Sequence, residues 1–122
     1  MRFLIIDDED FKVKRISNCL KGYTVDKATS YVSAIDKIHN NAYNGIFLDM
    51  GFPAFEDGSE YDREQGLNVL DEMKRIGDTT PVIIYSGRYS DVSSYTNISD
   101  YLPTDIDTER FMACISDLVH KR

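Results

Sequence analysis

Positive charge is scarce in this sequence: 14 lysine and arginine residues stand against 21 aspartate and glutamate residues, a formal net charge of −7. This balance gives no electrostatic reason to bind nucleic acid or an anionic membrane directly, so we expect neither partner. Long apolar runs are also missing, since no stretch approaches the roughly 20 residues of a membrane span. The start at Met1 lacks signal-peptide architecture. We therefore expect a cytoplasmic protein.

Cysteine is rare as well, with Cys19 and Cys114 the two examples in 122 residues. Both fall on predicted amphipathic helices without paired spacing, which indicates buried thiols in a reducing compartment rather than a disulfide framework. A chain of this length can bury a core without disulfides or structural metals. We expect one domain that spans residues 1–122.

Five short apolar segments alternate with stretches whose apolar residues recur at helical spacing. Strands are expected at residues 3–6, 23–26, 46–49, 82–85 and 101–102. Helices are expected at about residues 10–21, 31–42, 67–76 and from 107 onward, with a short or irregular helix within residues 89–97. Asp8 or Asp10 is expected to cap the first helix.

The strands differ in character, and the difference predicts their order. The first, third and fourth are continuous apolar runs, typical of central strands buried on both faces. The second and last are shorter and more mixed, as edge strands are. Because crossovers between parallel strands are right-handed, we expect an α/β fold: a flavodoxin-like, doubly wound, five-stranded parallel sheet in the order 2-1-3-4-5, with helices on both faces.

Residues 54–65 interrupt this alternation with five acids, one arginine and no apolar period. We expect most of this segment to be a mobile loop with little core contact. Its place beside the predicted site leaves several roles open: a lid, a source of a further metal ligand such as Glu56 or Asp57, or a partner surface. A solvated insertion is the simpler alternative, because surface loops tolerate added residues.

Acidic residues follow two neighbouring central strands of the predicted sheet. Asp7 and Asp8 come directly after the first strand, and Asp49 ends the third, just before Gly51 and Pro53 terminate the run. The strand order reverses between these two strands, and ligands bind at such a switch point in open parallel sheets. An aspartate after a strand is also a common turn former, which is the structural alternative for Asp49 taken alone.

Three carboxylates at one crevice would repel one another unless a proton or a cation neutralised them. Hard oxygen ligands with room for water favour Mg2+, with Asp8 and Asp49 as direct ligands, a backbone carbonyl near Gly51 as a third and Asp7 acting through water. A metal there would leave an Asp49 oxygen free to attack phosphorus. Ser86, at the end of the neighbouring strand, could hydrogen-bond the added phosphoryl oxygens.

Together, four segments of the chain resemble the response-regulator receiver family over nearly its whole length; they are Ile5-Ile6-Asp7-Asp8-Glu9, Leu48-Asp49-Met50-Gly51-Phe52-Pro53, Pro81-Val82-Ile83-Ile84-Tyr85-Ser86-Gly87 and Asp100-Tyr101-Leu102-Pro103. The resemblance implies that Asp49 accepts a phosphoryl group from the phosphohistidine of a sensor histidine kinase or phosphotransfer protein. It implies that Asp7, Asp8 and Asp49 hold Mg2+. It also implies that Ser86 and Tyr101 form a switch pair that alters a surface for a downstream protein target.

The chain departs from the family at the site's usual cation. The family places a lysine and then a proline after the last strand, where this sequence has Thr104 and Asp105. A phosphoryl group would therefore lose a charge-assisted partner, typically worth about 1.5–3 kcal/mol. Arg88 could substitute for it, or it could be an ordinary surface arginine.

Two further departures concern length. Residues 54–65 make the segment after Pro53 about nine residues longer than expected. The segment from Ser86 to Tyr101 is about four residues shorter than the usual spacing of the family that the chain resembles. The shorter segment lies on the family's usual output face, so we expect an altered partner mode there, and a homodimer is left open.

Three functions remain in competition. The leading one is a stand-alone receiver in a phosphorelay, with at most the self-phosphorylation and autodephosphorylation typical of receivers rather than turnover of a substrate. The alternative is a receiver-like protein-binding module without phosphotransfer, which the missing lysine would allow and the retained acids argue against. A metal-dependent phosphohydrolase is the third, but the sequence offers no additional base, since His39 and His120 are expected on helix surfaces.

Overall fold

A five-stranded parallel sheet in the order β2-β1-β3-β6-β7 forms the centre of the molecule. The computed structural model describes residues 1–120. The strands of the sheet are β1 (Arg2–Ile6), β2 (Thr24–Ala28), β3 (Gly45–Leu48), β6 (Val82–Tyr85) and β7 (Ile98–Leu102). Two shorter strands, β4 (Phe52–Pro53) and β5 (Tyr61–Asp62), pair separately and antiparallel. The predicted flavodoxin-like strand order is therefore confirmed.

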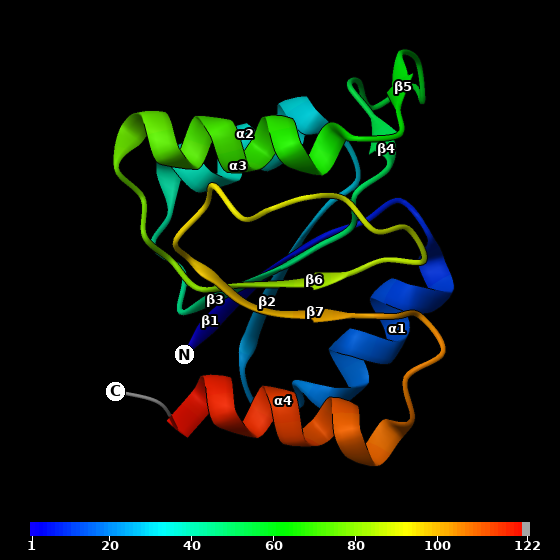
Figure 1. Ribbon diagram of the computed structural model, residues 1–122, viewed down its shortest axis with the longest axis vertical. Coiled ribbons are helices and arrows are strands. Elements are labelled where there is room, and N and C mark those ends of the chain that lie inside the picture. The colour runs from blue at the N-terminus through cyan, green and yellow to red at the C-terminus, as the bar shows by residue number, and fades with distance from the viewer. Residues whose placement is uncertain (121–122) are drawn as a thin grey trace.

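Helices cover both faces of the sheet (Figure 1). The helices α1 (Asp10–Cys19) and α4 (Thr108–His120) lie on one face, and α2 (Tyr31–Asn40) and α3 (Gln65–Ile76) lie on the other. Each pair of helices encloses its own apolar cluster against the sheet, which gives the three-layer arrangement of doubly wound folds. None of the helices within residues 1–120 has the length and apolar character needed to cross a membrane.

Burial separates the central strands from the edges as their composition predicts. Every residue of β3 and β6 is buried, and so is all of β1 after Arg2. The edge strands β2 and β7 have only partly exposed and exposed residues before a single buried residue at the end. At the β7 edge the Asp100 carboxylate accepts a hydrogen bond from the backbone N–H of Tyr101 at 3.0 Å.

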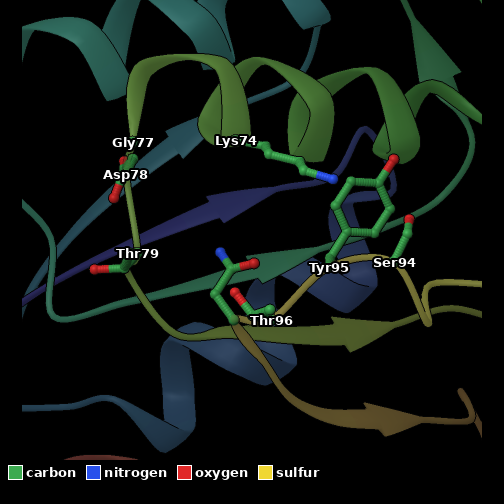
Figure 2. Close-up of a pocket in the computed structure, with 8 residues that line it drawn as sticks. Lys74, Gly77, Asp78, Thr79, Ser94, Tyr95 and Thr96 are labelled. Atoms are coloured by element: carbon green, nitrogen blue, oxygen red, sulfur yellow. The ribbon is translucent and has the colours of Figure 1, made fainter.

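The helix expected within residues 89–97 is absent from the described chain, which runs from β6 to β7 through turns. Serine-rich sequence favours such local turns, because serine side chains compete for backbone hydrogen bonds. Tyr95 anchors the segment to α3 by donating its hydroxyl to the Asp71 carboxylate, while the Lys74 ammonium lies 5.9 Å from the Tyr95 ring. Figure 2 shows the cavity of about 180 Å³ that remains between this segment and the end of α3.

The prediction of a loop for residues 54–65 is wrong in part, because the segment is a hairpin closed by β4 and β5. The backbone N–H of Ala54 donates to the carbonyl of Glu60 at 3.0 Å, and its carbonyl accepts from Val32 N–H at 3.0 Å. The Glu56 carboxylate accepts from the Thr29 hydroxyl at 2.8 Å. Glu56 is therefore directed at the β2–α2 turn, and the hairpin is tied to the body of the domain.

Other local expectations are also corrected. Glu9 is the N-cap of α1 and makes no side-chain cap hydrogen bond, so neither Asp8 nor Asp10 caps that helix. Cys19 and Cys114 are free thiols, as expected, but both are half-buried rather than buried. His39 and His120 lie on exposed helix positions, where the sequence placed them.

Candidate functional site

Three carboxylates meet at the carboxyl ends of β1 and β3. These strands pair with Ile6 opposite Leu48, so the residues that follow them emerge side by side. One carboxylate oxygen each from Asp7, Asp8 and Asp49 lies within 4.8 Å of the others. The structure therefore brings together the acids that the strand order placed at one crevice.

Burial makes this cluster electrostatically costly. Loss of solvent around Asp7, helped by the nearby Asp49 charge, raises the pKa of Asp7 to about 7. Burial, again with Asp49 contributing, also raises the pKa of Asp8, although Asp8 is more exposed. Burial and mutual repulsion thus disfavour the ionised carboxylates, and a bound cation would neutralise them. Hard carboxylate oxygens at this spacing form a donor set that suits Mg2+. The residues present thus fit the metal that the sequence predicts.

Asp49 is fixed by its backbone and by a close approach of α3. Its N–H donates to the carbonyl of Ile6 at 3.0 Å, and its Oδ1 accepts from the N–H of Met50 at 2.9 Å. A Cβ at Gly66, the first-turn glycine of α3, would lie 2.7 Å from the Asp49 carbonyl oxygen. Only glycine lets the helix pack this closely against the turn that carries Asp49.

Lys12 is the residue of the site that sequence reasoning missed. Its side chain is only 2 % exposed, and its Nζ lies 2.9 Å from Asp7 Oδ2 and 3.2 Å from Asp49 Oδ1. Burial opposes the charge, but the two carboxylates outweigh it and raise the pKa of Lys12. A signal was present: position 12 lies four residues before the buried Ile16, on the inward face of α1.

Asp49 lines a cavity of about 400 Å³ at the carboxyl ends of the strands. Besides Asp49 and Lys12, its lining includes Tyr61 of the hairpin together with Ser86, Arg88 and Thr104. Ser86 is buried, and its Oγ accepts a hydrogen bond from the N–H of Arg88 at 3.2 Å. The hairpin therefore contributes an aromatic wall to the site, while Glu56 and Asp57, the additional ligands considered above, are absent from the acid cluster of the described residues.

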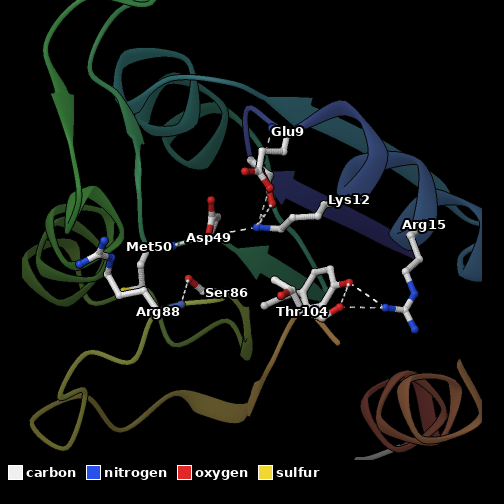
Figure 3. Close-up of polar contacts among 10 residues, drawn as sticks. Glu9, Lys12, Arg15, Asp49, Met50, Ser86, Arg88 and Thr104 are labelled. Atoms are coloured by element: carbon white, nitrogen blue, oxygen red, sulfur yellow. Dashed lines mark hydrogen bonds and ion pairs between the residues drawn. The ribbon is translucent and has the colours of Figure 1, made fainter. Parts of the chain in front are cut away.

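Thr104 and Arg88 line the cavity, but Thr104 is uncharged and Arg88 makes no ion pair with Asp49 among the described residues. The Arg88 guanidinium is turned away from Lys12 and Asp49 (Figure 3). The carbonyl of Thr104 accepts from Arg15 Nη1 at 3.3 Å and from the Tyr85 hydroxyl at 3.2 Å. Arg15 also donates to the carbonyl of Ile106 at 2.6 Å, so α1 holds the loop after β7.

Tyr101 completes a line of hydrogen bonds that starts at Ser86. Its hydroxyl donates to the carbonyl of Arg88 at 2.6 Å and accepts from the N–H of Ser90 at 2.8 Å. The ring packs against exposed Tyr89, with centroids 5.2 Å apart. The turn after β6 thus links the cavity to the surface.

Fold, acid cluster and the hydroxyl after β6 together define a receiver domain of a two-component response regulator. The family model described as "Response regulator receiver domain" matches residues 3–116, and the chain belongs to this family.

Known relatives agree with this assignment. The chain is 27% identical over 127 aligned residues to the response regulator MprA of Mycobacterium sp. (strain KMS), an alignment that covers 99% of this chain and 51% of that protein. The MprA of Mycobacterium avium (strain 104) is 26% identical, with 99% of this chain and 52% of that protein covered. The chain therefore spans about half the length of the curated relatives it matches.

Solved structures share the fold. A two-component response regulator from Clostridium difficile has a TM-score of 0.75 at 24% identity, with 99% of this chain and 97% of that chain covered. The response regulator TrrA from Thermotoga maritima, solved in complex with Mg2+-BeF, has a TM-score of 0.72 at 21% identity, with 96% of this chain and 97% of that chain covered.

Proposed function

We propose that this receiver domain accepts a phosphoryl group on Asp49 and thereby switches a protein-binding surface. The donor would be the phosphohistidine of a sensor histidine kinase or a phosphotransfer protein, and the recipient of the signal a downstream protein. The observation that carries the proposal is Asp49 itself, a carboxylate fixed by Met50 N–H and Lys12 at the wall of an open cavity.

The transfer is a simple displacement at phosphorus. A lone pair of an Asp49 carboxylate oxygen forms the new O–P bond, while the P–N bond of the phosphohistidine breaks and its electron pair returns to the ring nitrogen. Mg2+, held by Asp7, Asp8, Asp49 and the Gly51 backbone carbonyl, would supply charge neutralisation for the phosphoryl oxygens.

The switch would run through the turn after β6. If the Ser86 hydroxyl donated to phosphoryl oxygens and moved into the cavity, Oγ would move away from the N–H of Arg88, from which it accepts a hydrogen bond. The Arg88 carbonyl is held by Tyr101, so a shift of this turn would reach Tyr101 and the exposed ring of Tyr89. Their surroundings would therefore differ between the two states of Asp49.

A small-molecule phosphodonor tests the proposal without knowledge of the kinase. The protein would be incubated with Mg2+ and acetyl phosphate, and its intact mass measured. We expect one added phosphoryl group in the parent and in Asp57→Asn, an exposed hairpin control, and none in Asp49→Asn. A parent that stays unmodified with acetyl phosphate and with phosphoramidate would contradict the proposal and favour a binding module without phosphotransfer.

A further inference from the structure

Lys12 is a fully buried cation at the acceptor carboxylate, and it comes from α1 rather than from the end of a strand. Besides Asp7 and Asp49, its Nζ lies 3.6 Å from the exposed Glu9 carboxylate. Removing an ammonium from water is expensive unless close anions compensate it, so the position is maintained by these contacts. Figure 3 shows Lys12 extending from α1 between Glu9 and Asp49.

We propose that Lys12 is the phosphoryl-binding cation of this receiver, in place of the cation that Thr104 does not provide. The inference rests on the proposed function, because it concerns how a phosphoryl group on Asp49 is held. The ammonium already contacts an Asp49 oxygen and lines the same cavity as Ser86, so a group attached to Asp49 lies within its reach.

Neither Arg15 nor Arg88 makes an ion pair with Asp49 among the described residues. Arg15 uses its guanidinium on Tyr85 and on the carbonyls of Thr104 and Ile106. Arg88 is exposed and turned away from Asp49. Lys12 is the cation with an ion pair to Asp49 among residues 1–120.

Local packing explains how a helix residue reaches the strand ends. Lys12 lies in the first turn of α1, and side chains there point back toward the helix N-terminus, which faces the acids. Its Nζ lies 5.4 Å from the centroid of the Tyr85 ring. Arg15, one turn further on, donates to the Tyr85 hydroxyl at 2.8 Å and fixes that ring. The helix therefore pre-positions the ammonium and braces the Thr104 loop together.

The negative charge of the acid cluster is large enough to balance both Lys12 and a divalent cation. The carboxylates of Asp7, Asp8 and Asp49 sum to three negative charges when ionised, which one ammonium and one divalent ion would neutralise together. Phosphorylation would replace the single negative charge of Asp49 with about two negative charges. The electrostatic attraction between this group and the Lys12 ammonium would therefore become stronger.

Beryllofluoride with Mg2+ is the probe that tests Lys12, with intact-mass phosphorylation as a second readout. The variants are Lys12→Met, which keeps the length without the charge, and Lys14→Met, an exposed lysine of the same helix, as control. We expect Lys12→Met to bind beryllofluoride about tenfold or more weakly, the loss of one charge-assisted hydrogen bond, and Lys14→Met to bind like the parent. Affinity for Mg2+ alone should not fall in Lys12→Met.

A second substitution separates charge from structure. Thr104→Lys in the Lys12→Met background returns a cation to the cavity from its other wall, and we expect it to recover most of the lost affinity. A folded Lys12→Met that binds beryllofluoride and accepts the phosphoryl group as the parent does would overturn the role of Lys12. Failure of the parent and of Thr104→Lys alike to accept a phosphoryl group would instead overturn the proposed function, and the inference with it.

Discussion

The Tyr101 hydroxyl donates a 2.6 Å hydrogen bond to the backbone carbonyl of Arg88, two residues beyond Ser86. With the bond it accepts from Ser90 N–H, one phenol satisfies two backbone groups of the turn after β6. This turn has no helix to stabilise it, so the side chain of an edge strand takes over part of that task.

Tyr101→Phe should therefore destabilise the turn while it keeps the packing of the aromatic ring. We expect a loss of about 1–2 kcal/mol in the free energy of unfolding, because two backbone partners lose a hydrogen bond, and faster amide exchange at Ser90. Tyr89→Phe is the control, since Tyr89 is 78 % exposed. Equal Ser90 exchange in the two variants would contradict this role.

Magnesium binding should depend on the acid cluster. Asp8→Asn and Asp49→Asn each remove a negative charge from three closely spaced carboxylates, so we expect each to weaken Mg2+ about tenfold or more in calorimetric titration. Asp117→Asn, on the exposed face of α4, should leave the affinity unchanged. Unchanged affinity in both cluster variants would place the ion elsewhere.

The same binding should depend on pH around neutrality. With the pKa of Asp7 raised to about 7 by burial and by Asp49, this carboxyl holds a proton below that pH, and Mg2+ must displace it. Affinity should therefore rise from pH 6 to pH 8 by up to about tenfold per unit below the pKa, with proton release seen as a buffer-dependent binding enthalpy. In Asp7→Asn the slope should flatten; an unchanged slope would assign the proton to another group.

Gly66→Ala should disturb the acceptor turn through packing alone. The added Cβ would lie 2.7 Å from the Asp49 carbonyl oxygen and 2.5 Å from Met50 Cε. We expect a loss of about 1–3 kcal/mol of stability in urea unfolding, typical of overpacking, and weaker Mg2+ binding. Gly87→Ala is the matched control for stability, since its Cβ would meet Thr104 at 3.6 Å. Equal losses in the two variants would show that α3 can move aside.

Arg15→Lys should release the loop after β7 despite keeping the charge. Lysine lacks the planar fork with which Arg15 reaches Tyr85, Thr104 and Ile106. We expect a loss of about 1–3 kcal/mol in unfolding free energy and shifted amide resonances at residues 104–106. Arg110→Lys, at an exposed position of α4, should have neither effect. Unchanged resonances would mean that the loop keeps its conformation without the Arg15 hydrogen bonds.

Strand order was predictable because it depends on features that single segments carry. Continuous apolar runs marked β1, β3 and β6 as central, and the handedness of parallel crossovers left few arrangements. The convergence of Asp7, Asp8 and Asp49 followed from that order. Hairpin residues 54–65 were harder, since a polar segment can become regular through backbone pairing and contacts to distant residues such as Thr29 and Val32.

The helical pattern placed Lys12 on the inward face of α1, but charge and local pattern did not identify its partners. A lysine in the first turn of a helix that begins with acidic residues is expected to be solvated, because lysine is almost never fully buried unless paired. Its partners become known only once β1, β3 and α1 are placed together. The sequence showed that a cation was missing after the last strand, but not that a helix could present one to the same carboxylate.

The Asp100 contact at the β7 edge affects how readily the sheet can pair with another copy of the protein. An edge strand with free N–H groups offers a template on which another chain can extend the sheet and aggregate. Here the Asp100 carboxylate occupies the N–H of Tyr101 and adds charge to that border, while Asp26 and Lys27 place both signs of charge on the opposite edge strand. Pro103 follows directly and cannot donate to a further strand. Both borders of the sheet are therefore poorly suited to edge-to-edge polymerisation.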